Sequence, residues 1–70
     1  GRLKMTKTIE TEYYGTITVR DAMASPDGTS LQPLIEIRGE NVDIDIYEMH
    51  SDEVTEDNID EIIEDNESGY

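Results

Sequence analysis

The sequence predicts a small α+β domain, in which a small antiparallel sheet of three or four strands precedes one C-terminal acidic amphipathic helix. Three observations predict this class: apolar and polar residues alternate early in the chain, two short apolar segments flank a glycine turn in the middle, and isoleucines recur at helical spacing near the end. Seventy residues suffice for one domain with a small core. We assign residues 5–67 to this domain, residues 1–4 to a remnant of an expression tag and residues 68–70 to a frayed C-terminus.

Residues 8–23 alternate between apolar and polar side chains, a pattern typical of a half-buried strand. Gly15 interrupts this pattern, and two arrangements keep the apolar residues on one face. The first is a single long strand that bends or bulges at Gly15. The second is a hairpin whose three-residue loop pairs Tyr13 with Ile17. The bent strand is our preferred interpretation, although the sequence leaves both arrangements open.

A second pair of strands follows a turn at residues 25–28, where Pro fixes φ and Gly supplies a positive φ. Residues 34–38 and 42–48 are then predicted to form a hairpin around residues 39–40. An antiparallel hairpin of this kind buries one face and leaves the other in solvent. The alternation in both strands therefore predicts which side chains point inward.

The register of this hairpin is predicted by pairing Arg38 with Asn41, which aligns the isoleucines of both strands on one face. On the other face the same register brings Glu36 near Asp43. Like charges directly opposite one another are destabilising. We expect Arg38 to offset that repulsion.

The predicted helix begins near Thr55 and runs to about Asn66. With Thr55 as the N-cap, Val54 and Ile59 occupy the two positions of a hydrophobic staple. The isoleucines of this segment lie on one helical face, which we expect to pack on the sheet. The full list of predicted core residues is Ile9, Tyr13, Ile17, Val19, Met23, Leu31, Ile35, Ile37, Val42, Ile44, Ile46, Met49, Val54, Ile59, Ile62 and Ile63.

Charge is distributed very unevenly along the chain. Of the 18 acidic residues ten follow Tyr47, whereas no Lys or Arg follows Arg38. The first 47 residues carry 5 basic and 8 acidic groups, so they contribute only −3 to the net charge of −13. A dense anionic surface on one part of a small protein predicts a strongly basic partner.

The predicted partner-binding surface is the outer face of the helix and its surroundings. Five acidic residues follow the i, i+3, i+4, i+7, i+8 pattern and therefore share a face opposite the isoleucines: Asp57, Asp60, Glu61, Glu64 and Asp65. Four further residues are predicted to extend this surface: Glu53, Asp43, Asp45 and Tyr47. The competing interpretation is a solvated face that serves solubility.

Catalytic and metal-binding motifs do not compete with a binding function. The sequence has no cysteine and one histidine, which excludes the common zinc sites. His50 is followed by Ser51 and Asp52, but three consecutive residues cannot easily adopt the geometry of a catalytic triad. We therefore expect no enzymatic activity, no cofactor and no metal. The lack of a basic patch disfavours direct binding to nucleic acid.

In its short length, its pI of about 4.1, its small sheet and its carboxylates on a helix, the chain resembles the small acidic phage proteins that mimic DNA. The resemblance implies a protein of the host cytoplasm that occupies the basic nucleic-acid-binding site of a nuclease, CRISPR effector, restriction or repair protein. The alternative is a small structural or assembly subunit that can form homo-oligomers, a homodimer among them, and whose acidity serves solubility or halophilic adaptation. No membrane association is expected.

Overall fold

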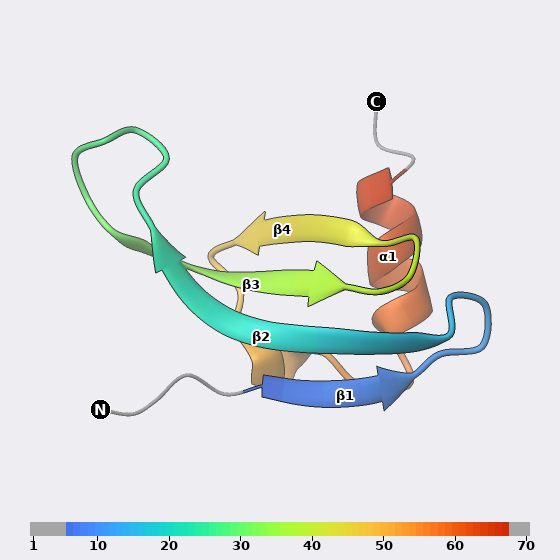
Figure 1. Ribbon diagram of the computed structural model, residues 1–70. Helices are drawn as coiled ribbons and strands as arrows, with labels where there is room; N and C mark the ends of the chain where they lie inside the picture. Colours follow the sequence, from blue (N-terminus) through green and yellow to red (C-terminus); the bar gives the residue numbers. More distant parts are fainter. Residues whose placement is uncertain (1–5, 68–70) are drawn as a thin grey trace.

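The computed structural model describes residues 6–67, which form a four-stranded antiparallel sheet with a helix on one face (Figure 1). This confirms the predicted α+β class. The strands follow chain order in a simple meander, so each strand pairs with the next along the sequence. The elements are β1 (Thr6–Glu10), β2 (Thr16–Ala24), β3 (Gln32–Arg38), β4 (Asp43–Tyr47), the short 3₁₀ helix η1 (Ser51–Glu53) and α1 (Ile59–Glu67). The predictions for residues 1–4 and 68–70 lie outside the described residues.

The first part of the sheet is a hairpin, so the preferred prediction of one bent strand was wrong. The predicted loop was also too short, because Ile17 pairs with Ile9 rather than with Tyr13. Residues 11–15 form the loop, and the Thr11 side chain closes it: its Oγ1 donates to the Gly15 carbonyl and accepts the Tyr14 N–H, at 2.7 and 2.8 Å. Odd residues still pair with odd residues, so the predicted inward face is correct.

The hairpin of β3 and β4 forms with a register two residues away from the predicted one. Gly39 and Val42 exchange backbone hydrogen bonds of 2.8 and 3.5 Å, so residues 40–41 make the turn. Ile37 then lies opposite Ile44. A Cβ on Gly39 would lie 2.5 Å from the Cδ1 of Ile17, so any larger residue at this end of the strand would require the Ile17 side chain to move. A shift of two residues preserves the face of every side chain.

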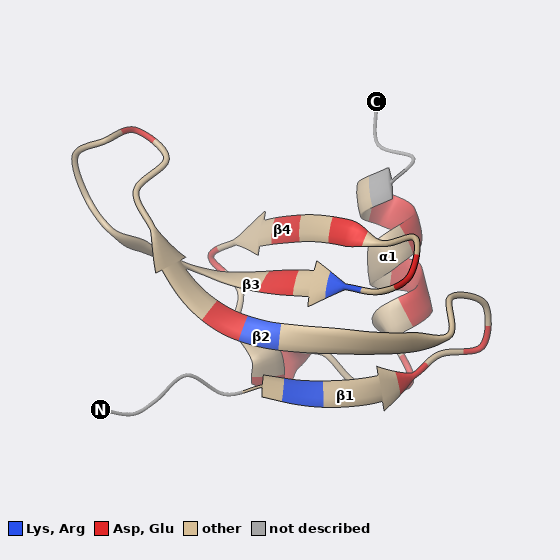
Figure 2. Cartoon of the chain, viewed as in Figure 1, with Lys and Arg blue, Asp and Glu red and all other residues tan. Residues whose placement is uncertain are grey.

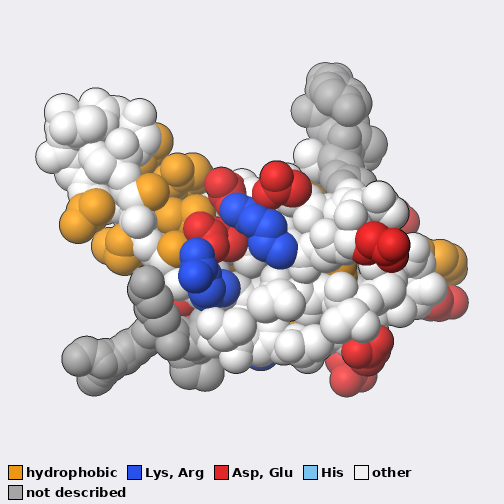
Figure 3. All heavy atoms as spheres, viewed as in Figure 1, with side chains coloured by type: hydrophobic (Ala, Val, Ile, Leu, Met, Phe, Trp, Pro, Cys, Tyr) orange, Lys and Arg blue, Asp and Glu red, His pale blue; other side chains and the backbone are white. Residues whose placement is uncertain are grey.

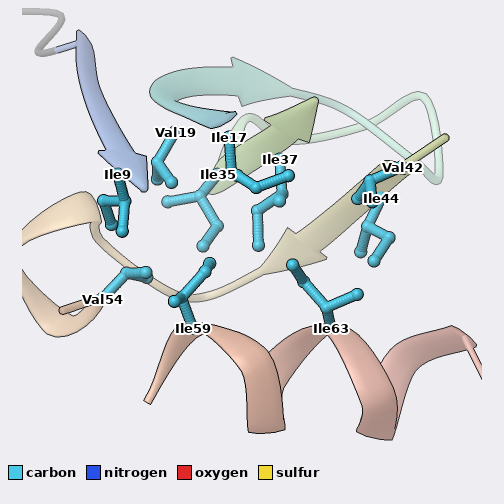
Figure 4. Close-up of a cluster of buried hydrophobic side chains, with 10 residues drawn as sticks. All are labelled: Ile9, Ile17, Val19, Ile35, Ile37, Val42, Ile44, Val54, Ile59 and Ile63. Atoms are coloured by element: carbon cyan, nitrogen blue, oxygen red, sulfur yellow. The ribbon is translucent and has the colours of Figure 1, made fainter. Parts of the chain in front are cut away.

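The core lies between the inner face of the sheet and α1 (Figure 4). Its members come from all four strands, the η1–α1 connection and the helix: Ile9, Ile17, Val19, Ile35, Ile37, Val42, Ile44, Val54, Ile59 and Ile63. Three residues that were predicted to be buried are exposed instead, namely Tyr13, Met23 and Leu31, at 70%, 55% and 67%. Tyr13 is in the first loop, and the other two belong to the end of the β2–β3 hairpin, which projects beyond the helix-covered part of the sheet (Figure 1).

The α-helix begins four residues later than predicted, at Ile59, although the capping contacts expected at Thr55 are present. Thr55 Oγ1 accepts the Asp57 N–H at 3.2 Å, as an N-cap does. The Asn58 side chain reaches back to accept the Thr55 N–H at 2.8 Å, which completes a reciprocal cap. Val54 and Ile59, the two staple residues, are fully buried. Regular α-helix begins at Ile59 after a turn at residues 56–58.

The connection between β4 and α1 is attached to the inner sheet face by polar contacts. Asp21 on β2 accepts hydrogen bonds from the backbone N–H and the hydroxyl of Ser51, at 2.9 and 2.7 Å. Lys7 on β1 donates to the carbonyl of Val54. These contacts hold the connection against the sheet and thereby fix where the helix begins. Within residues 6–67, no helix is long and apolar enough to cross a membrane.

Candidate acidic interface

The outer face of α1 and of the turn before it carries a row of exposed carboxylates. Ile59 and Ile63 are fully buried against the sheet, which turns the opposite side of the helix to solvent. Asp57, Glu61, Glu64 and Asp65 are exposed on this segment. Figure 2 shows that α1 carries acidic residues and no Lys or Arg. We call these four residues the helix carboxylate row.

Asp60 was predicted to belong to this row, but in the structure its side chain contacts the loop between β1 and β2. Its side chain is half-buried and faces the loop between β1 and β2. Its carboxylate oxygens accept long hydrogen bonds from the backbone N–H groups of Glu12 and Tyr13, at 3.5 and 3.4 Å. Asp60 therefore joins the helix to the first loop. The sequence shows no signal for this role, because Glu12 and Asp60 are 48 residues apart along the chain.

Glu53 also has an internal partner. Its Oε2 accepts the backbone N–H of His50 at 3.0 Å, so the carboxylate caps the start of η1. The residue remains exposed to solvent at the same time. It lies outside the helix, at the end of the connection that Asp21 anchors.

The outer face of the sheet carries a second group of charges, which are paired. Arg38 binds two β4 carboxylates, with Nε 3.1 Å from Asp43 Oδ1 and Nη2 2.9 Å from Asp45 Oδ1. Arg20 forms an ion pair with Glu36 directly across the β2–β3 ladder. The hydrogen bond that Arg38 donates to Asp45, together with the nearby negative charges, raises the pKa of Arg38 above its ordinary value. We call this group the sheet ion-pair cluster.

The cluster contains the predicted mixture of acidic residues and Arg38, but the residues that lie opposite one another differ from the prediction. Glu36 lies opposite Asp45 and not Asp43, because the register differs by two residues. Arg38 still offsets the acidic side chains, as expected. Figure 3 shows basic side chains interleaved with acidic ones at the centre of this face, beside a hydrophobic patch below the β2–β3 loop. A surface depression of about 400 Å³ is lined by Thr18, Arg20, Glu36 and Arg38.

The two charged groups lie on opposite faces of the sheet. Ile44 on β4 belongs to the core below α1, so its neighbours Asp43 and Asp45 point to the other side. Tyr47 has the same parity as these aspartates and is 39% exposed. The predicted extension of the helix surface onto Asp43, Asp45 and Tyr47 is therefore not formed. These three residues lie on a separate surface.

The described cations are all engaged away from the helix row. Three of the five Lys and Arg residues fall within residues 6–67: Lys7, Arg20 and Arg38. Lys7 donates to a backbone carbonyl, and the two arginines pair with carboxylates of β3 and β4. The uneven charge distribution in the sequence thus becomes a spatial separation between a sheet face that carries both arginines and a helix face that carries exposed carboxylates.

Other groups in this part of the chain have structural roles. Among the described residues, no cluster of His, Asp and Glu is arranged to hold a metal ion. A hollow of about 200 Å³ is lined by Asp21, His50, Ser51 and Asp52. Ser51 is buried and its hydroxyl donates to Asp21, so its hydroxyl anchors η1 on the sheet. Asp21 occupies an inward position of its strand, where a carboxylate needs a hydrogen-bond partner, and this signal for the anchor was missed in the sequence analysis.

Comparisons with models of protein families, with curated proteins and with solved structures find no match to this chain. A functional assignment must therefore rest on the chemistry of the helix carboxylate row and of the surfaces around it.

Proposed function

We propose that the protein binds and inhibits a nucleic-acid-binding protein by presenting the helix carboxylate row as a mimic of a phosphate backbone. Its partner is a basic cleft of the kind found in nucleases, CRISPR effectors, restriction proteins and repair proteins. The observation that carries the proposal is the exposed row of Asp57, Glu61, Glu64 and Asp65, in a molecule whose described cations are bound elsewhere.

The spacing of the row supports this function. Three members of the row, Glu61, Glu64 and Asp65, lie within α1, and at 1.5 Å per residue they span about 6 Å of its axis. These three charges have two intervals between them, so they are about 3 Å apart on average along the axis. One strand of a DNA duplex carries a charge every 3.4 Å of axis or so. A cleft that binds a phosphate backbone would therefore meet a similar linear charge density on this helix.

The row also has an energetic cost that folding alone does not explain. Glu61 is three or four residues away from each of the other three members, so it takes part in three like-charge pairs. Each such pair destabilises a helix by about 0.2–0.5 kcal/mol. The total of about 0.6–1.5 kcal/mol is a noticeable share of the stability of so small a domain. Keeping these side chains makes sense if a basic partner uses them.

The proposal is tested by changing charge on the row while monitoring the fold. Glu61→Lys replaces attraction by repulsion in a basic cleft, and it turns all three like-charge pairs into opposite-charge pairs. Asp27→Lys is the matched control, because it makes the same charge change in the β2–β3 loop, far from α1 (Figure 1). Partners are captured from a lysate at low and at high salt, and then tested for competition against a labelled oligonucleotide.

The expected outcome is a captured nucleic-acid-binding protein that high salt releases, because charge-driven association is screened by salt. Glu61→Lys should lose competition with the oligonucleotide, whereas Asp27→Lys should retain most of it. A partner without a nucleic-acid site, or full competition by Glu61→Lys, would show that phosphate mimicry by this helix is the wrong function.

A further inference from the structure

The two outer strands of the sheet differ in what they offer to another strand. The meander places β1 at one edge and β4 at the other, and an edge strand presents backbone groups that its only neighbour does not use. Natural proteins often protect such edges with charged side chains. The two edges of this protein are protected to very different extents.

The hydrogen-bond pattern fixes which β1 residues point their backbone outward. The Thr11 N–H donates to the Gly15 carbonyl at 2.9 Å, which continues the ladder in which Ile9 pairs with Ile17. Hydrogen-bonded and non-bonded pairs alternate along an antiparallel ladder. Lys7 and Ile9 therefore bond to β2, and Thr8 directs its N–H and C=O away from the sheet. Thr6 and Glu10 do the same on either side of it.

The same argument at β4 gives an edge that repels a partner strand. Gly39 and Val42 form a hydrogen-bonded pair, so Asp43, Asp45 and Tyr47 direct their backbone groups outward. An antiparallel copy centred on this edge would place Asp45 opposite Asp45. Like charges directly opposite one another are destabilising, so β4 is protected against self-pairing.

We propose that β1 pairs with β1 of a second copy of this chain, antiparallel about a two-fold axis at Thr8. The two sheets then continue into one sheet across the axis. Thr8 faces Thr8 of the second copy, a cross-strand pair that can share a hydroxyl hydrogen bond. Thr6 faces Glu10 of the second copy, and the side chains of Thr6, Thr8 and Glu10 are all exposed in the single chain. This surface goes beyond the proposed function, since it uses neither α1 nor a basic partner.

Charge favours this edge over any other surface of the molecule. Each β1 strand contributes one cation, Lys7, and one anion, Glu10, so the paired strands are neutral in a protein of net charge −13. The acidic helix contacts β4 and covers the inner face of the sheet, whereas Thr6, Thr8 and Glu10 carry their side chains on the outer face. The remaining repulsion between copies acts over longer distances, which salt screens beyond about 8 Å at physiological ionic strength. Self-association should therefore strengthen with salt, whereas binding to a basic partner should weaken.

Disulfide trapping tests the pairing directly, because the chain contains no cysteine. Hydrogen-bonded pairs in an antiparallel ladder have Cα atoms about 5.5 Å apart, within the range that a disulfide accepts. Thr8→Cys should therefore form a covalent dimer under oxidised glutathione. Glu10→Cys is the matched control on the same edge. In the proposed register the two Glu10 positions are offset by about 13 Å along the strand, so this variant should form little dimer.

Two further results are expected from the same register. A mixture of Thr6→Cys and Glu10→Cys should give the mixed dimer in preference to either homodimer, since these positions face each other across the axis. Thr8→Pro removes an N–H that the single chain does not use, so it should keep the fold by circular dichroism and shift sedimentation towards the monomer. Equal trapping of Thr8→Cys and Glu10→Cys, or unchanged self-association of Thr8→Pro, would overturn the proposal. A chain that sediments as a monomer at all concentrations and salt levels would overturn it as well.

Discussion

The outer face of the sheet and the outer face of the helix are both rich in carboxylates. The carboxylates of the sheet form ion pairs with arginines, whereas the helix carries no Lys or Arg. On the sheet, Arg38 lies between Asp43 and Asp45, and every charge of the cluster has an oppositely charged neighbour. On the helix, acidic residues follow one another at helical spacing without a Lys or Arg. The comparison teaches that acidity alone does not mark an interface in this protein. The helix row is a surface of exposed carboxylates on a segment that carries no Lys or Arg.

The largest expected effect concerns the anchor that holds the helix row in place. Ile63 is fully buried, so Ile63→Ala should destabilise the domain by about 2–5 kcal/mol, which approaches its whole stability. Ile62 is only half-buried and serves as the matched control, so Ile62→Ala should cost clearly less. Thermal unfolding measures both variants. Similar melting temperatures for the two would mean that the helix does not dock through the face described above.

The next effect tests whether the sheet cluster is a structural pairing. Arg38→Met keeps much of the side-chain volume but leaves Asp43 and Asp45 close together without their cation. Because Arg38 is partly exposed and solvent screens its ion pairs, we expect a loss of about 1 kcal/mol. Chemical denaturation in low salt measures the loss, and high salt should reduce it. If the variant is as stable as the parent in low salt, the ion pairs of Arg38 do not stabilise the fold, and the sheet face does not differ from the helix face in this respect.

A smaller effect is expected at Asp60, the residue that belongs to neither group completely. Asp60→Ala removes the acceptor of two long hydrogen bonds from the first loop, and it also removes one negative charge from the helix. These two consequences oppose each other, so the net change in stability should stay within about 1 kcal/mol. The specific signature is local: amide hydrogen exchange should accelerate at Glu12 and Tyr13 and remain unchanged in β3. Unchanged exchange in the loop would mean that Asp60 contributes only its charge.

Much of the fold could be predicted because it follows from local patterns. The α+β class, the inward faces of the strands and the cap at Thr55 were all predicted from alternation, spacing and capping chemistry. The strand registers could not be fixed in this way, since a shift of two residues leaves every side chain on the same face. The deciding contacts are tertiary, as between Gly39 and Ile17, or depend on a loop side chain, as at Thr11.

The candidate site could be predicted only as a set of charges. Spacing along the helix identified the exposed row, but it could not separate Asp60, whose partners lie in another hairpin. The position of Asp43 and Asp45 away from the helix does follow from the pattern, because they alternate with isoleucines that point to the face that α1 covers. Ion pairing is a property of the folded chain, so the pairing of Arg38 with Asp43 and Asp45 and of Arg20 with Glu36 appears only in the structure.

The most direct test of the central claim is a paired measurement on Glu61→Lys, the change that affects every like-charge pair of the row. The melting temperature should stay equal to that of the parent or rise, because about 0.2–0.5 kcal/mol of repulsion per pair is replaced by attraction. Competition with a labelled oligonucleotide for the captured partner should be lost in the same sample. A variant that melts lower and still competes fully would contradict the account, because the carboxylates would then serve the fold and not the partner.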